Sequence, residues 1–314
     1  MVLFKRKRVT AVKVETASGT PETLSASDAE FNIYDAVINE TVNVTKRESQ
    51  GSFDRLKASA GTRSGVATFK TDVAWDGTAT LPTWATVLFP CCGYVNSAGA
   101  FTPRSEAPGS NVKTATIGVY SDGKRKQLSG AAGTFRLVMP AGERAFIEWT
   151  FTGSYDGETA QTLLSPTYPD PASEVAIRFA SATLTYDSVA AKVAEASLDA
   201  GNQVVLREDG TTASGYCGAI VADREPMFRM NPEAVLIATQ DRNNNWLSED
   251  EAAISVVLDG PSTSDITIAI PKAQIMNAPE GEREGMLTDE LEFMCNKNGS
   301  TADEDVTITF NETV

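Results

Sequence analysis

Histidine is absent from this chain, and its absence removes several kinds of chemistry at once. Without imidazole there is no histidine general base, no serine–histidine–aspartate triad, and none of the usual histidine ligands of zinc and haem. Cysteine is scarce, and no C-x-x-C spacing indicates a zinc or redox motif; the four cysteines are Cys91, Cys92, Cys217 and Cys295. We therefore expect reduced, mostly buried thiols, no metal, no cofactor and no enzymatic activity.

Long apolar runs are missing as well. No segment approaches the roughly 20 apolar residues that a membrane-spanning helix needs. The basic cluster at residues 5–8 is not followed by an apolar segment, so it does not resemble a secretory signal. With four charges and no aromatic residue, the cluster favours a flexible terminus over a nucleic-acid or membrane patch. We expect a protein without membrane contact that is made and folded in the cytoplasm.

Positive charge is scarce in the second half of the chain. The formal net charge is -15 over 314 residues. Residues 1–165 hold 18 basic and 16 acidic side chains, a balance of +2, whereas residues 166–314 hold 9 and 26, a balance of -17. A protein that binds nucleic acid over its whole surface would have the opposite sign, because affinity comes largely from neutralising phosphates.

Apolar residues alternate with polar ones along much of the chain, which is the pattern of β-strands. The alternation is strict at Ile254, Val256 and Leu258, and again in residues 266–270 and 306–310. Only residues 83–89 and 232–238 favour short helices, each beside a proline that suits the first helical turn. The pattern predicts a mainly β protein with one short helix in each half.

Two landmarks recur in the same order in the two halves. The pentapeptide PAGER at residues 140–144 is repeated as PEGER at residues 279–283, and an alternating strand follows each copy. An Asp-Gly pair precedes each copy, at residues 122–123 and 259–260. Because an ordered recurrence indicates an internal repeat, we predict two tandem β-sandwich domains, residues 1–165 and residues 166–314. The proline-rich segment 165–171 marks the boundary between them.

A basic, polar segment interrupts the first hairpin between residues 46 and 65. Alternation is lost there, and loops of this length are commonly functional. We predict a long hairpin loop that reaches the acidic surface of a neighbouring subunit, where its apolar side chains become buried and its charges fix the register. Simple solvation of an exposed tip is the alternative. The candidate contact residues are Lys46, Arg47, Phe53, Arg55, Leu56, Lys57 and Arg63.

Three polar segments raise other possibilities. Residues 241–245 resemble the opening of a calcium loop, but Trp246 replaces the required glycine and Ala252 the closing carboxylate, so a polar hairpin tip is the simpler explanation. The carboxylate runs at 249–251 and 303–305 could supply a glycosidase pair, because the spacing that matters is three-dimensional. A solvated surface is the usual explanation, but a carbohydrate-binding or hydrolysing β-sandwich protein stays an alternative.

Several short motifs together resemble those of the tail tube (major tail) proteins of long-tailed bacteriophages. The resemblance covers roughly residues 10–155, with a weaker echo over residues 283–310. The motifs are VKVETASGTP at 12–21, WATVLFPCCG at 84–93, TIGVYSDG at 116–123, LSGAAGT at 128–134 and EWTFTGSY at 148–155.

The resemblance implies a structural virion protein that assembles into stacked rings in the host cytoplasm and forms the hollow tail tube. Its partners would be other copies of itself, the tape-measure protein and DNA in the lumen without specific binding, and the terminator and tail-tip proteins. It implies that a long hairpin contacts the next ring. Many such proteins carry one tube domain per chain and form hexamers, so the apparent duplication favours trimeric rings; a second half that decorates the outside would restore hexamers. A tail terminator or the tube of a contractile tail are alternatives within the virion.

Overall fold

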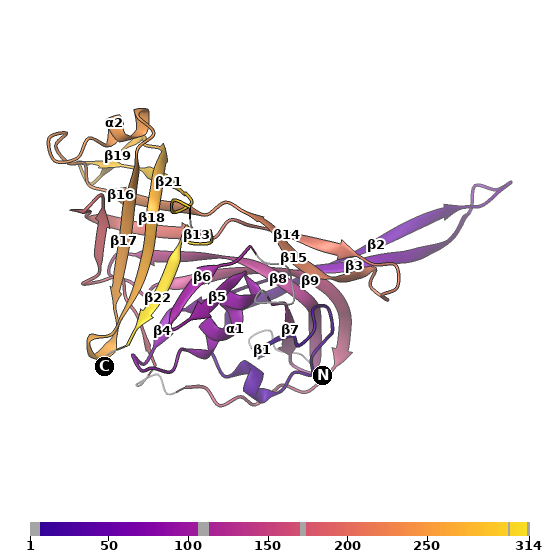
Figure 1. Ribbon diagram of the computed structural model, residues 1–314. Coiled ribbons are helices and arrows are strands. Elements are labelled where there is room, and N and C mark those ends of the chain that lie inside the picture. Colours follow the sequence, from indigo (N-terminus) through magenta and orange to yellow (C-terminus); the bar gives the residue numbers. More distant parts are fainter. Residues whose placement is uncertain (1–6, 106–112, 170–173, 301, 313–314) are drawn as a thin grey trace.

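The computed structural model describes residues 7–105, 113–169, 174–300 and 302–312, so Lys5 and Arg6 of the basic cluster and residues 170–171 of the predicted boundary lie outside it. The chain is mainly β with large antiparallel sheets, which confirms the predicted fold class at that level. Below, the first half means residues 7–165 and the second half residues 166–312. Figure 1 shows the first half as the indigo to magenta part and the second half as the part that runs from rose through orange to yellow.

The first half contains nine strands and two short helices among its described residues. They are β1 (Arg8–Val14), η1 (Ala26–Ala29), β2 (Tyr34–Glu48), β3 (Arg55–Asp72), β4 (Ala74–Trp75), α1 (Thr83–Cys91), β5 (Tyr94–Ser97), β6 (Ala100–Pro103), β7 (Ala115–Ser121), β8 (Lys124–Pro140) and β9 (Phe146–Ala160).

The second half consists of shorter strands. They are β10 (Val175–Ala176), β11 (Thr183–Tyr186), β12 (Val189–Ala190), β13 (Val193–Asp199), β14 (Asn202–Glu208), β15 (Tyr216–Arg224), β16 (Met227–Pro232), β17 (Glu251–Asp259), β18 (Asp265–Asn277), β19 (Glu280–Arg283), β20 (Met286–Asp289), β21 (Leu291–Cys295) and β22 (Thr307–Asn311), with helices α2 (Arg242–Leu247) and η2 (Pro261–Thr263).

Six strands of each half pair in the same order. In the first half the antiparallel neighbours run β1-β7-β8-β9-β3-β2, and in the second half they run β11-β17-β18-β21-β16-β13. If the six strands of each series are numbered along the chain, their order across the sheet is 1-4-5-6-3-2 in both halves. The helix lies between the third and fourth strand in each series, α1 after β3 and α2 after β16.

The hairpins that join the second and third strands also correspond. In the first half β2 and β3 are continuous, whereas in the second half each side is split, into β13 with β14 and into β15 with β16. Both hairpins have a bulge near the start, between Tyr34 and Val37 on β2 and between Val193 and Ala196 on β13. A bulge places one extra residue against the partner strand, so its recurrence is a specific shared irregularity.

The two halves share one sheet and one core. Strand β13 pairs with the end of β8, β22 pairs with β6, and β10 pairs with β4. The buried apolar side chains of both halves belong to a single cluster, and Phe310 of β22 contacts the rings of Trp75, Trp84 and Phe101. The division into two domains after residue 165 stays a prediction, since extensive contacts cross it.

One helix prediction is confirmed and the other is wrong. Helix α1 begins after Pro82 and covers the predicted residues 83–89. Residues 232–238 are not helical, because Pro232 ends β16 and the Asn231 side chain accepts backbone hydrogen bonds from Ala194 and Glu195 at the β13 bulge, both 2.9 Å. The helix α2 lies ten residues later, in the segment expected to be a hairpin tip, and Asp241 caps it by accepting from Asn244 N at 2.9 Å.

Candidate assembly surfaces

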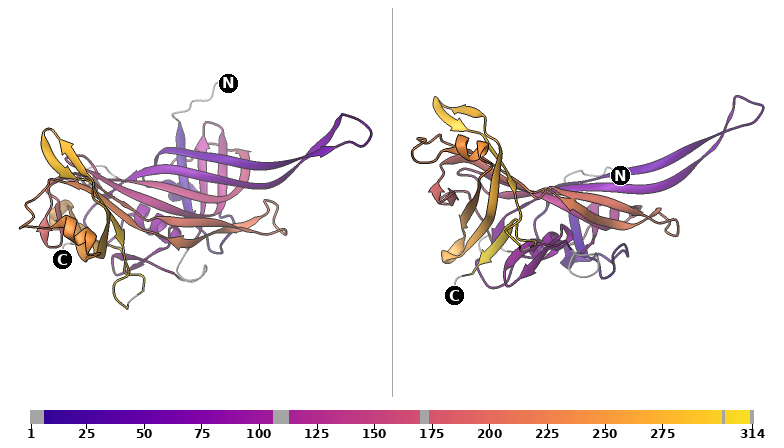
Figure 2. Two further views of the ribbon diagram at one scale, coloured as in Figure 1. Left: turned by 90° about the horizontal axis from the view of Figure 1, so that it is seen from above. Right: turned by 45° about the horizontal axis from the view of Figure 1, so that its top comes forward.

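A hairpin of β2 and β3 projects far from the body of the molecule (Figures 1 and 2). The sequence predicted a long loop over residues 46–65, and this prediction is wrong in part. The ladder continues to the pair Glu48 and Arg55, so only residues 49–54 form the turn. Backbone pairing explains the difference, because strands that are solvated on both faces need no alternation of apolar and polar side chains.

The projecting part of this hairpin, residues 41–63, exposes several large apolar side chains. Val42 and Val44 are 40% and 54% exposed, and Phe53 in the turn is fully exposed. It is also basic, with five lysine or arginine residues against two acidic ones. Of the predicted contact residues, Lys46, Arg47, Phe53, Arg55, Leu56 and Lys57 lie on its outer portion and are exposed.

Arg63, the seventh predicted contact residue, is placed differently. It lies near the base of the projection, where its backbone N donates to Ser214 O at 2.9 Å and its side chain donates to Ala213 O at 3.1 Å. Both carbonyls belong to the turn of the β14–β15 hairpin, which lies beside β2 and β3 near the base of the projection (Figure 1). Arg63 therefore joins the two hairpins within one chain.

The β14–β15 hairpin is held against the first half by a close approach of backbones. Gly130 of β8 has a φ of +57°, and a Cβ built on it would lie 2.6 Å from the Cα of Gly218 on β15 and 3.0 Å from the Cα of Gly19. Only glycine fits such a contact, since any side chain would separate the three segments. Ala219, the next residue on β15, is 1% exposed.

Glu15 fixes the segment that carries Gly19. Its buried carboxylate accepts hydrogen bonds from Gly19 N, Gly130 N and the hydroxyls of Thr114 and Thr116, at 2.7 to 2.8 Å. A carboxylate with four donors is well satisfied despite its burial. Glu15 thereby links the segment that carries Gly19 to β7 and to Gly130 of β8.

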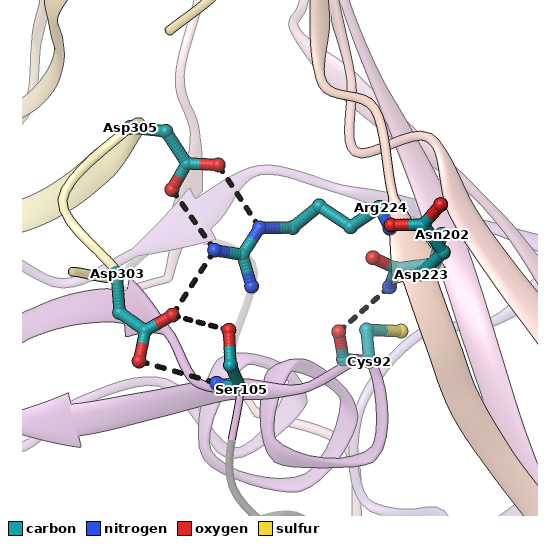
Figure 3. A network of polar contacts seen from close by, with 7 residues as sticks. All are labelled: Cys92, Ser105, Asn202, Asp223, Arg224, Asp303 and Asp305. Atoms are coloured by element: carbon teal, nitrogen blue, oxygen red, sulfur yellow. Dashed lines mark hydrogen bonds and ion pairs between the residues drawn. The ribbon is translucent and has the colours of Figure 1, made fainter. Parts of the chain in front are cut away.

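A polar network closes the other side of the contact between the halves (Figure 3). The guanidinium of Arg224 on β15 donates to Asp305 at 2.9 Å and to Asp303 at 3.2 Å, and the hydroxyl of Ser105 donates to Asp303 at 2.7 Å. Partial burial alone would raise the pKa of Asp303, but the hydrogen bonds from Ser105 and Arg224 outweigh it and hold that pKa below its ordinary value. The Asn202 side chain donates to Cys92 O at 2.7 Å and to Gly133 O at 2.9 Å.

Carboxylates of the acidic runs 249–251 and 303–305 form ion pairs and hydrogen bonds with neighbouring side chains. Glu251 forms an ion pair with Lys272 at 3.6 Å, and Asp250 accepts from the Ser248 hydroxyl at 2.7 Å. Asp303 and Asp305 belong to the Arg224 network. Within the described ranges, no group of three or more Cys, Asp or Glu side chains is arranged to hold a metal ion. The cysteines are all free thiols; three are buried and Cys217 is half-buried.

The face of the continuous sheet that points away from the core carries paired charges. Lys70 of β3 contacts Glu148 of β9 at 2.7 Å, and Arg229 of β16 forms an ion pair with Glu292 of β21. Lys272 of β18 is paired with Glu251, as described above. Three of the cations on this face are thereby neutralised by carboxylates on adjacent strands.

No protein-family model matches the chain, and no curated protein matches it. None of the helices in the described part of the chain has the length and apolar character needed to cross a membrane.

Several residues at these surfaces could not be identified from the sequence. Arg224, Asn202 and Gly218 lie outside the motifs singled out in the sequence, and their partners are up to about 200 residues away. Glu15 and Gly19 carried a signal through the motif at residues 12–21, and Gly130 through the motif at residues 128–134.

Proposed function

We propose that this chain is a structural component of a bacteriophage tail, a tail tube protein that assembles into stacked rings. The observation that carries the proposal is the recurrence of one six-strand pairing order in the two halves of a mainly β chain. The motifs that resemble the tail tube family support it, since they fall on the buried Glu15 segment, on α1 and on strands β7, β8 and β9.

The recurrence supports an internal duplication. Two unrelated β domains have no reason to share a pairing order, a helix at the same point of the chain and a bulge at the start of the same hairpin. Each half would be one β-sandwich tube module. Three chains would then supply six similar modules, and a closed ring satisfies all the contacts between them. We therefore favour trimeric rings with approximate sixfold symmetry over hexamers.

Ring formation would also cover strand edges that are unpaired in the isolated chain. The main path of the large sheet ends at β2 on one side and at β12 on the other. Unpaired strand edges invite pairing with another chain, and a closed assembly removes such edges. In a ring, β2 of one copy would pair with the end of β18 of the next, as its counterpart β13 pairs with the end of β8 within the chain, and the copies would form a continuous wall.

The charge distribution suits a conduit for DNA. The second half carries most of the net negative charge, and cations on the outward face of the sheet are paired with carboxylates. A wall with this charge would repel phosphate and let DNA and the tape-measure protein pass without sticking. The tail terminator and tail-tip proteins would bind the ends of the tube.

The test is electron microscopy of the purified full-length protein and of the particle that contains it. The expected result is rings or hollow tubes with threefold symmetry, in which each of three subunits contributes two similar modules. A protein that stays monomeric at all concentrations, or that is absent from the virion, would refute the proposal. Rings with true sixfold averages would keep the tail function but reject the trimer.

A further inference from the structure

We propose that the projecting part of the β2–β3 hairpin, residues 41–63, docks on the second half of another copy of this chain. The docking would repeat the way in which β14–β15 docks on the first half within each chain. The inference rests on the proposed assembly function and adds the surface that receives the hairpin.

The first step is the correspondence of the two hairpins. Strands β13 and β14 together occupy the place of β2 in the pairing order, and β15 and β16 together occupy the place of β3. The hairpins have nearly equal lengths, residues 34–72 and 193–232, and both begin with a bulge. The β14–β15 pair is therefore the counterpart of the projecting part of β2–β3.

The second step is that the counterpart is already docked. The β14–β15 hairpin rests on β8, with Gly218 against Gly130, and Gly215 of its turn lies against Thr62 of β3. Ala219, the residue that follows Gly218 on β15, is also buried. The chain itself thus contains one complete example of how such a hairpin engages the neighbouring module.

The third step is that the projecting part of β2–β3 lacks the equivalent contact. Val44 and Leu56 are about half exposed and Phe53 fully exposed, although Val44 and Leu56 lie on paired strands. In a closed ring the first half of one copy is followed by the second half of the next, so the surface in register is the counterpart of β8 and β9. Those counterparts are β18 and, together, β21 and β22, which pair with β18 along successive stretches.

Charge favours the same occupant. The projecting part carries five basic and two acidic residues, a balance of +3, and the second half carries a balance of -17. The opposite net charge of the hairpin and of the second half as a whole accelerates their association, and it disfavours contact between the hairpins of two copies. A second copy of this chain therefore supplies both the matching fold and the matching charge.

A second exposed apolar surface of the second half is an alternative docking site for the hairpin, and the experiment must distinguish the two sites. Leu236, Ile237 and Leu247 are 74–78% exposed around α2, at the end of the second half far from the hairpin tip (Figure 2). The repeated topology does not place a hairpin there, because α1, which takes the place of α2 in the first half, is buried under the sheet.

The experiment places a benzophenone photocrosslinking amino acid at Val44 of the full-length chain, followed by assembly, irradiation and mass spectrometry. We expect cross-links between chains that end in β18, β21 or β22. Cross-links that end in α2 or residues 233–241, or assembled rings without any cross-link between chains, would overturn the docking proposal while leaving the tail function intact. A wild-type chain that never assembles would refute the proposed function and this inference with it.

A pair of variants gives an independent measurement. Val42→Asp combined with Val44→Asp should leave the thermal unfolding of the monomer unchanged, since both side chains are exposed, but raise the concentration needed for assembly by at least about tenfold, because carboxylates buried without partners are costly. The matched control is Val175→Asp, at a valine of similar exposure on β10. Equal assembly of the double variant and the control would contradict the proposal.

Discussion

Gly130→Ala is the substitution that best tests the contact between the two halves. The new methyl group would lie 2.6 Å from the Cα of Gly218 and 3.0 Å from the Cα of Gly19, both of them backbone atoms that cannot rotate away. The residue would also occupy a φ of +57°, which costs an alanine about 1 kcal/mol relative to glycine. Overpacking against backbone adds about 1–3 kcal/mol.

The sum is a loss of about 2–4 kcal/mol in the free energy of unfolding. For a chain of this size that corresponds to a fall in Tm of about 4–8 °C, at about 2 °C per kcal/mol. The assay is differential scanning calorimetry at a protein concentration below that of assembly, so that only the single chain is measured.

Gly142→Ala is the matched control. Gly142 also has a positive φ, +76°, but a Cβ built on it meets no atom within 4 Å. It should therefore show the conformational cost of about 1 kcal/mol without the packing cost. If the two variants lose the same stability, the three backbones do not approach as closely as described, and the reasoning on the docked β14–β15 hairpin loses its main contact.

Three further outcomes are expected. Glu15→Gln should lower the free energy of unfolding by about 2–4 kcal/mol in urea titrations, because the amide nitrogen cannot accept from the donors that surround the carboxylate; an unchanged midpoint would contradict the network. Asp303 has a lowered pKa in the folded chain, so its stabilising contribution is complete above the ordinary aspartate pKa of about 4 and is lost as the pH falls through the lower folded value. Asp303→Asn should accordingly flatten the decline of Tm between pH 5 and pH 2.5, and parallel curves for the two proteins would refute this. Replacing residues 45–59 by an Asn-Gly turn keeps the pair Val44 and Ala60 and should leave folded subunits that fail to form tubes in negative-stain images; tubes of normal length would refute the assembly role of the projecting hairpin.

The candidate site was only partly predictable from the sequence. The basic and apolar residues of the projecting hairpin were identified from composition, because five cations within a short segment stand out against an acidic chain. The paired strands beneath them were missed, since side chains solvated on both faces leave no periodic signal. Arg63 was grouped with the tip by its charge, whereas its place near the turn of β14–β15 follows from a hydrogen bond between segments 150 residues apart.

The helix error has a similar cause. Asn231 and Pro232 together suggest a helix start, and this local preference is genuine. In the folded chain the Asn231 side chain instead accepts hydrogen bonds from the backbone of the β13 bulge, and Pro232 lies at the end of β16. A cap residue binds whichever backbone donors the tertiary structure brings to it, and in this case those donors belong to another strand.

The amino-acid sequence by itself determined the strand-rich class, the position of α1 and the recurrence of landmarks in two halves, because these depend on residue periodicity and on turns a few residues long. The tertiary structure alone decided which strands pair, that both halves share one pairing order and one core, and that one hairpin is docked while its counterpart projects. Pairing is a relation between backbones far apart in the chain, and every strand offers the same hydrogen-bonding groups, so only the folded arrangement selects among the possible neighbours.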